Sequence, residues 1–192
     1  SYLKLFEYRG PDSQNIYENE DRTFFLGFNR LSIIDLSSNA NQPFENNDTI
    51  VSSNCEIYNF KEIKKELINY DFKSNSDSEV IIHGYSKWKD ELFSKLKGMF
   101  SINIYEKKHQ LTLARDRFGI KPIFYYHDHD KFIFCSEFFP LISALKDLSI
   151  NLEENFEILE NYFFGPYNFS SKTSIKNIYK LEPGSFLKID DK

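Results

Sequence analysis

The sequence predicts an α+β fold in which antiparallel β-sheets are packed between helices. The aromatic content is high, with 20 Phe and 12 Tyr in 192 residues, and such flat side chains pack well on a pleated sheet. Four strand-like runs follow one another between residues 100 and 135, separated by turn residues, as in antiparallel neighbours. Helical periodicity precedes and follows these runs, so helices are expected to cover the outer faces. The length is that of one domain.

The first quarter of the chain is predicted to hold one helical segment and three strands. Residues 2–8 form the helical segment, which Gly10 and Pro11 end because glycine accepts a left-handed cap and proline lacks a donor. The strands are predicted from β-branched and aromatic residues at 23–28, 31–34 and 49–53.

Two helices are predicted next. Apolar residues recur at helical spacing at Ile57, Phe60, Ile63 and Leu67. The stretch "SDSE" at 76–79 is typical of a capping box, with Ser76 as N-cap and Glu79 reaching back to it. The buried face of this second helix is expected to contain Val80, Ile81, Tyr85 and Trp88.

The rest of the chain is predicted to be an antiparallel meander followed by helices and a last strand. The strands are expected at 100–105, 111–114, 123–126 and 132–135, the helices at 138–145 and 156–163, and the last strand at 185–189.

Composition and charge argue against several kinds of partner. A net charge of −5 is unsuited to a nucleic-acid backbone, which requires a concentrated basic face. No apolar run approaches the ~20 residues that span a bilayer, and no leader opens the chain. Two cysteines, Cys55 and Cys135, do not make a disulfide framework, so a reduced, cytoplasmic location is expected.

Two charged motifs each have two interpretations. "HDHD" at 127–130 could bind a divalent metal, but its place between two strands favours a solvated turn and no metal. "RDR" at 115–117 could bind an anion through a guanidinium fork, although an ion-pair cluster that holds a tight strand connection is favoured.

A second group of polar residues is compatible with a ligand pocket. Arg30 opens an apolar run and needs either a structural carboxylate or a ligand. Asn54 is either a helix N-cap or an oxyanion donor together with the next backbone N–H. Glu56 and Asp77 are either first-turn acids or counter-charges for an ammonium group. Cys55, between them, is either a nucleophile or a small packing residue, and the flanking carboxylates oppose a thiolate.

The order of these motifs carries a resemblance that single motifs do not. "RGPD" (9–12), "RLSIIDL" (30–36), "QP" (42–43), "NCEIYN" (54–59), "SDSEVI" (76–81), "GMF" (98–100), "RDRFGIKPIFYY" (115–126), "SE" (136–137) and "EPG" (182–184) succeed one another. This succession covers nearly the whole chain and resembles the glutaminase (class II amidotransferase) domain of glutamine-hydrolysing asparagine synthetases. The resemblance implies an N-terminal-nucleophile hydrolase fold, an αββα sandwich of two antiparallel sheets.

The resemblance also implies a chemistry. An N-terminal cysteine attacks the side-chain amide of glutamine, and ammonia passes to a synthetase domain of the same parent chain. Arg30 would bind the α-carboxylate, Asp77 with Glu56 the ammonium, and Asn54 with the Cys55 N–H the oxyanion. Leu31 and Ile33 complete the implied glutamine site. No cofactor or metal is expected in this domain; ATP and Mg are expected in the synthetase domain, and a homodimer is possible.

Residues 1–192 depart from the family pattern in two places. The family begins with a strand that carries the nucleophile, and only "SYLKLFEY" precedes "RGPD" here, with Ser1 unsuited to replace it. We therefore expect no glutamine hydrolysis by these residues alone, and an apolar groove where the first strand would lie. The family also has glycine where Cys55 stands, so a positive φ there would cost ~1–2 kcal/mol. A non-catalytic scaffold, or an amidotransferase with another acceptor, remains an alternative.

Overall fold

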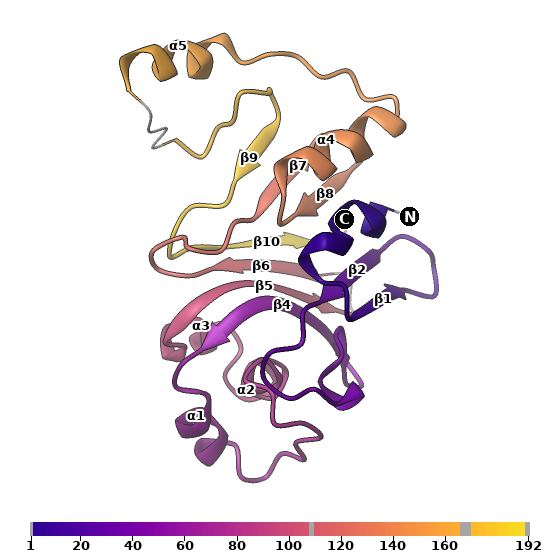
Figure 1. The fold of residues 1–192 in the computed structure, drawn as a ribbon, viewed down its shortest axis with the longest axis vertical. Helices are drawn as coiled ribbons and strands as arrows, with labels where there is room; N and C mark the ends of the chain where they lie inside the picture. Colours follow the sequence, from indigo (N-terminus) through magenta and orange to yellow (C-terminus); the bar gives the residue numbers. More distant parts are fainter. Residues whose placement is uncertain (1, 108–109, 166–169, 191–192) are drawn as a thin grey trace.

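One five-stranded antiparallel sheet forms the centre of the computed structural model, which describes residues 2–107, 110–165 and 170–190. Its strand order is β10-β6-β5-β4-β3. The strands are β3 (Phe44–Glu45), β4 (Thr49–Ile57), β5 (Gly98–Glu106), β6 (Gln110–Arg115) and β10 (Phe186–Asp190). One side of this sheet is covered by α1 (Phe60–Glu66), α2 (Glu79–Trp88) and α3 (Glu91–Lys95), as Figure 1 shows.

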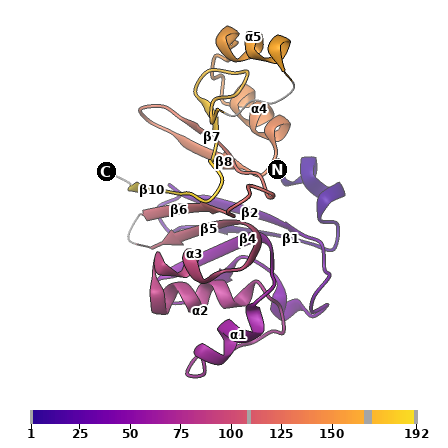
Figure 2. The ribbon, with the colours of Figure 1, turned by 90° about the vertical axis from the view of Figure 1, so that its left-hand side faces the viewer.

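The opposite layer consists of two separate antiparallel sheets. One is the hairpin of β1 (Ser13–Glu18) and β2 (Phe25–Arg30), and the other has the order β8-β7-β9. The latter strands are β7 (Phe124–His127), β8 (Phe132–Cys135) and β9 (Ile178–Lys180). Beyond them lies α4 (Phe138–Asp147), so that β7 and β8 separate α4 from the central sheet (Figure 2). The remaining elements are η1 (Tyr2–Arg9), η2 (Ser38–Ala40) and α5 (Phe156–Phe164).

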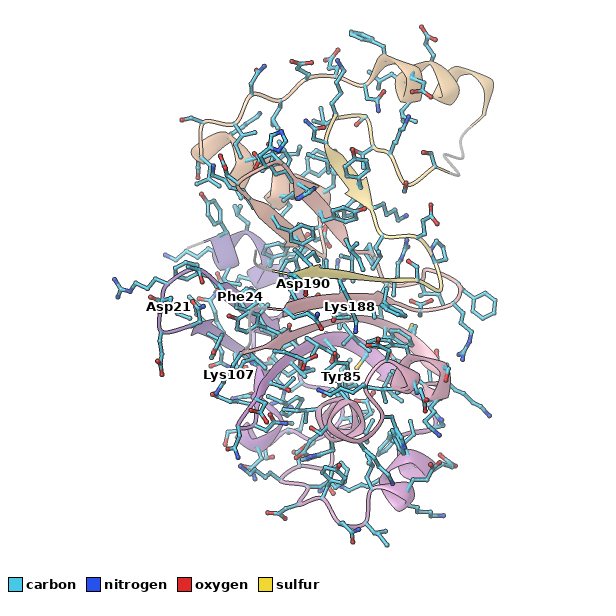
Figure 3. The ribbon with its side chains drawn as sticks, turned by 180° about the vertical axis from the view of Figure 1, so that it is seen from behind. Asp21, Phe24, Tyr85, Lys107, Lys188 and Asp190 are labelled. Atoms are coloured by element: carbon cyan, nitrogen blue, oxygen red, sulfur yellow. The ribbon has the colours of Figure 1, made fainter. Side chains whose placement is uncertain are left out.

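Three apolar clusters hold these layers together. The first packs α1 and α2 on one face of the central sheet and includes Tyr85, which is fully buried. The second lies on the other face and includes Tyr105, on which Phe24 stacks at a ring-centroid distance of 3.9 Å. Figure 3 labels Phe24 and Tyr85 on opposite sides of the sheet. The third cluster joins α4 to β7 and β8. The expectation of an αββα sandwich is thus met, with a second layer that is divided between β2 and β8.

Several predicted elements need correction. Residues 31–34 form an irregular loop instead of a strand, and Ile33 is 71% exposed, because these apolar residues have no sheet partner. Ile57 is the last residue of β4 and not the start of a helix, since the helix α1 begins at Phe60. The predicted meander is divided, with β5 and β6 in the central sheet and β7 and β8 in the other layer. The short elements β1, β3, β9 and α3 are not predicted from the sequence.

Two local predictions about caps are wrong. The N-cap of α2 is Ser78 and not Ser76, because the Glu79 carboxylate instead accepts the N–H groups of Lys73 and Ser74. Gly10 has no positive φ; a Cβ there would lie 2.5 Å from the backbone carbon of Asn29, so glycine allows η1 to approach β2.

None of the helices in the described ranges combines the length and apolar character that crossing a bilayer requires.

Candidate functional site

Beyond the short strand β3, which pairs only with residues 50 and 51 of β4, the outer edge of β4 has one N–H group without a hydrogen-bond partner in the described part of the chain. Residues 53, 55 and 57 direct their N–H and C=O groups away from β5, because these groups alternate along an antiparallel strand. At Ser53 both groups bond to the side-chain amide of Gln42. Its Oε1 accepts from the Ser53 N–H at 2.6 Å, and its Nε2 donates to the Ser53 C=O at 3.1 Å. At Ile57 the N–H donates to Asp77 Oδ2 at 2.7 Å. Between these two positions the Cys55 N–H points to the edge and has no hydrogen-bond partner among the described residues.

Asn54 lies beside this open N–H on the face of β4 turned away from α1 and α2. Its side chain makes no hydrogen bond to any described residue, and it is half-buried. The surrounding face is polar: Ser101 pairs with Asn54 and Asn103 with Ser52, and Asn103 Nδ2 donates to Ser52 Oγ at 3.1 Å. A free amide and a free backbone N–H are therefore adjacent on a buried polar floor, an arrangement that can stabilise a developing oxyanion.

The thiol of Cys55 points to the opposite face. Its Sγ lies 3.4 Å from Ser53 Oγ, and it packs against the core cluster of α1 and α2. Burial, and then the negative charge of Asp77, raises the pKa of the Cys55 thiol to about 12. A thiol with that pKa is a poor nucleophile near neutral pH. Cys55 is not among the residues with positive φ, so its Cβ causes no strain; the interpretation as a packing residue is favoured.

Two carboxylates stand at the same edge in different surroundings. Asp77 is 6% exposed, and burial raises its pKa against the opposing effect of the Ile57 N–H. Glu56 follows Asn54 on the groove-facing side of β4 and is exposed. One buried and one exposed negative charge near the same backbone position provide a place for an ammonium group.

The guanidinium of Arg30 contacts backbone carbonyls and one side-chain amide instead of a structural carboxylate. Arg30 ends β2 and is 7% exposed, and its guanidinium donates to the carbonyl oxygen of Asp35. It also donates to Ser37 O and to Asn41 Oδ1, both at 2.8 Å. No structural carboxylate pairs with Arg30 among the described residues, so the guanidinium holds the loop after β2. Three of its five N–H donors are bonded in this way.

One groove brings all the predicted site residues together. This cavity of about 1470 Å³ runs between β4 and β5 on one side and β2 and β8 on the other. Its lining includes Arg30, Leu31, Ile33, Asn54, Cys55, Glu56 and Asp77. Leu31 and Ile33 border it from the exposed loop. Every residue of β2 and of β8 borders the groove. Because β2 pairs with β1 and β8 with β7, we infer that the other edge of each strand faces this gap.

The "RDR" motif holds a strand connection in a different manner from that predicted, whereas "HDHD" lies at a largely exposed turn, as predicted. Arg115 and Asp116 form no ion pair within the described ranges: Arg115 donates to carbonyl oxygens and the Asp116 carboxylate accepts backbone N–H groups. Burial opposes ionisation of Asp116, but these N–H donors keep its pKa below the ordinary value. "HDHD" lies at the β7–β8 turn, where Asp128 Oδ1 accepts the N–H groups of Asp130 and Lys131. Among the described residues no group of three His, Cys, Asp or Glu side chains could hold a metal.

Four further residues border the groove without a role predicted from the sequence: Gln42, Ser101, Asn103 and Lys121. The sequence does hold a signal for Ser101 and Asn103: "FSINIY" at 100–105 alternates apolar and polar residues, which predicts a strand with one polar face. For Gln42 the sequence holds no such signal, because its bonds to the edge of β4 are a tertiary contact. Ser1 lies outside the described residues.

Sequence comparison places the chain among proteins that use glutamine. The profile of the family described as "Glutamine amidotransferase domain" matches residues 1–192. "Asparagine synthetase [glutamine-hydrolyzing] 1" of Bacillus subtilis is 38% identical over 187 residues, which are 95% of this chain and 28% of that protein. "Asparagine synthetase [glutamine-hydrolyzing] 2" of the same organism is 47% identical over 139 residues, 71% of this chain and 18% of that protein. The chain thus spans under a third of these relatives.

Structural comparison supports the fold. The glutamine phosphoribosylpyrophosphate amidotransferase of B. subtilis matches with a TM-score of 0.59 and 20% identity. The match covers 86% of this chain and 32% of that one. The arrangement of sheets and helices is therefore that of an N-terminal-nucleophile hydrolase-type amidotransferase domain.

Proposed function

The chain belongs to the glutamine amidotransferase domain family, and we propose that it is the glutaminase part of an asparagine-synthetase-like enzyme. The names of its relatives support this assignment. In this proposal ammonia released from glutamine amidates aspartate in a synthetase segment outside residues 1–192, where ATP and Mg would be used. The observation that carries the proposal is the uncovered Cys55 N–H beside the free amide of Asn54.

These two donors would act on the γ-amide of glutamine. When a nucleophile attacks the amide carbon, the carbonyl oxygen gains negative charge. The Asn54 Nδ2 and the Cys55 N–H would bind this oxygen at the floor of the groove. Because both donors are already in place and unpaired, they need no reorganisation during the reaction.

The other end of glutamine would be held by the charges around it. Asp77 would receive the α-ammonium, supported by Glu56 at the rim. Arg30 retains two N–H donors after its bonds to the loop, and these would receive the α-carboxylate. Leu31 and Ile33 would border the substrate from the loop that follows β2.

The nucleophile would come from a strand placed in the groove. The edges of β2 and β8 face one gap, and a strand there would join the two sheets of the second layer into one. Neither cysteine of residues 1–192 fits the role, because burial raises the pKa of Cys135 to about 11 and that of Cys55 to about 12. We therefore propose that residues 1–192 by themselves release no glutamate from glutamine.

Calorimetric titration of residues 1–192 with L-glutamine tests the binding half of the proposal. Asp77→Asn keeps an oxygen for the Ile57 N–H but removes the charge, so glutamine affinity should fall about tenfold or more. Asp71→Asn changes an exposed carboxylate outside the groove and should leave the affinity unchanged. Equal affinities for wild type and Asp77→Asn would refute the ammonium site.

A second candidate function is a scaffold that has kept the glutaminase fold without its chemistry. The observation in its favour is the high thiol pKa at both cysteines, since no thiolate is available among residues 1–192. The polypeptide that the natural reading frame encodes distinguishes the two. Release of glutamate and ammonia from glutamine by that polypeptide would exclude the scaffold, whereas no release from a folded sample would support it.

A further inference from the structure

The backbone of Lys121 is held on both sides by charged side chains. Its N–H donates to Asp116 Oδ2 at 3.0 Å, and its C=O accepts from Arg115 Nε at 2.7 Å. Both peptide groups of the residue are therefore fixed by charged side chains, which form stronger hydrogen bonds than neutral groups. Pro122 follows and fixes the next φ.

The same two side chains fix the loop that leads to Lys121. Asp116 also accepts the N–H groups of Phe118 and Ile120 at 3.1 and 3.0 Å. Arg115 also donates to the carbonyl oxygen of Gly119. At Gly119 φ is +63°, and a Cβ would lie 2.8 Å from the Arg115 guanidinium, so only glycine fits. The loop between β6 and β7 is thus rigid, and Lys121 is the residue of this loop that lines the groove.

The Lys121 ammonium has no hydrogen-bond or carboxylate partner within the described ranges, although the side chain is partly buried. By contrast, Lys89 and Lys107 each pair with a glutamate. Lys121 lines the groove together with Asn54 and Cys55. Its charge reaches the Cys55 thiol, where it lowers the pKa against the larger effects of burial and of Asp77.

We propose that Lys121 is an anion subsite of the groove, which favours negative charge on the γ-group of the bound amino acid next to Asn54 and the Cys55 N–H. The subsite rests on the glutamine site proposed above. Its ligand class is a γ-carboxylate, as in glutamate, or the oxyanion that develops on the γ-amide. A neutral amide gains less from an ammonium group than a carboxylate does, so the subsite distinguishes charge and not shape.

The negative charges around the site give a cation an effect on ligand binding. Asp77 and Glu56 are negative and border the same groove. They favour the α-ammonium, but they oppose any second negative charge at the other end of the ligand. An unpaired ammonium on a rigid loop offsets that repulsion without reorganisation.

The test is the ratio of L-glutamate to L-glutamine affinity, measured by calorimetry with residues 1–192. Lys121→Met keeps most of the length of the side chain and removes its charge. We expect the glutamate affinity to fall about threefold to fivefold, as for a partly solvated charge pair, with the glutamine affinity unchanged. Lys65→Met, an exposed lysine on α1 outside the groove, should change neither affinity. Lys121→Arg should retain the wild-type ratio.

The outcomes separate this inference from the proposed function. If Asp77→Asn weakens glutamine binding but Lys121→Met leaves the glutamate-to-glutamine ratio unchanged, the anion subsite is refuted and the glutamine site stands. If Lys121→Met weakens both amino acids equally, the side chain supports the pocket in general and the subsite is also refuted. If wild type binds neither amino acid, the glutamine site and the subsite both fail.

Discussion

Removing the Asp116 carboxylate should strongly destabilise the domain. This side chain is 0% exposed and accepts four backbone N–H groups, those of Phe100, Phe118, Ile120 and Lys121, at 3.0–3.2 Å. In Asp116→Ala no other acceptor replaces it, so each donor must find water or remain unpaired. The change therefore tests whether the loop between β6 and β7 is held in the way the structure indicates.

The magnitude follows from where the four donors lie. Phe118 and Ile120 are 82% and 55% exposed and Lys121 is partly buried, so these three N–H groups can reach water at ~0.5–1 kcal/mol each. Phe100 is 3% exposed, and its N–H would be left buried at ~1–3 kcal/mol. Together the loss is about 2.5–6 kcal/mol, a large part of the ~5–15 kcal/mol of a typical domain.

Urea denaturation followed by circular dichroism measures this loss. Asp116→Asn retains one acceptor oxygen and should lose about half as much, while Asp71→Ala, at an exposed position, should lose less than ~0.5 kcal/mol. A loss below ~1 kcal/mol in Asp116→Ala would show that the four bonds contribute little, and the argument for a rigid Lys121 would fail with them.

Three further predictions concern other parts of the molecule. Gly10→Ala forces a Cβ to 2.5 Å from the Asn29 backbone and should cost ~1–3 kcal/mol, visible as a lower melting temperature; an unchanged value would contradict the close packing of η1. Glu79 has its pKa lowered from 4.5 to about 2, by hydrogen bonds that outweigh burial. Its stabilising effect is complete above the unfolded pKa and is lost as the pH falls towards 2, so the stability gap between wild type and Glu79→Gln should narrow over that range; a constant gap would contradict this. Cys55 should react with iodoacetamide at pH 8 far more slowly than a cysteine in an unfolded peptide, and a comparable rate would return it to the candidate nucleophiles.

The sequence predicted the elements whose residues repeat with a clear period. The strands now seen as β4 to β8 were located because β-branched and aromatic residues alternate there with turns between them. By contrast, "LSII" at 31–34 is predicted as a strand from composition alone, and the structure shows a loop held by Arg30. Whether a segment forms a strand depends on neighbouring strands as much as on its own residues, and no strand in the described residues pairs with this segment.

The sequence proposed the residues of the candidate site but not their contacts. Arg30, Asn54 and Asp77 border one groove, as the resemblance implied. The partners of Arg30 could not be read from the sequence, because they are backbone carbonyls that the loop places around it. The cover of the β4 edge by Gln42 is likewise a tertiary contact between residues 11 positions apart.

The direct test of the oxyanion site is the turnover number of Asn54→Ala with glutamine, in the polypeptide that the natural reading frame encodes. Because Asn54 makes no side-chain hydrogen bond to a described residue, its loss should not alter the melting temperature. We expect kcat to fall about 10²–10³-fold, the effect of removing one oxyanion donor, with KM for glutamine changed by less than about threefold. A kcat within about threefold of wild type would show that the open edge of β4 does not carry the reaction.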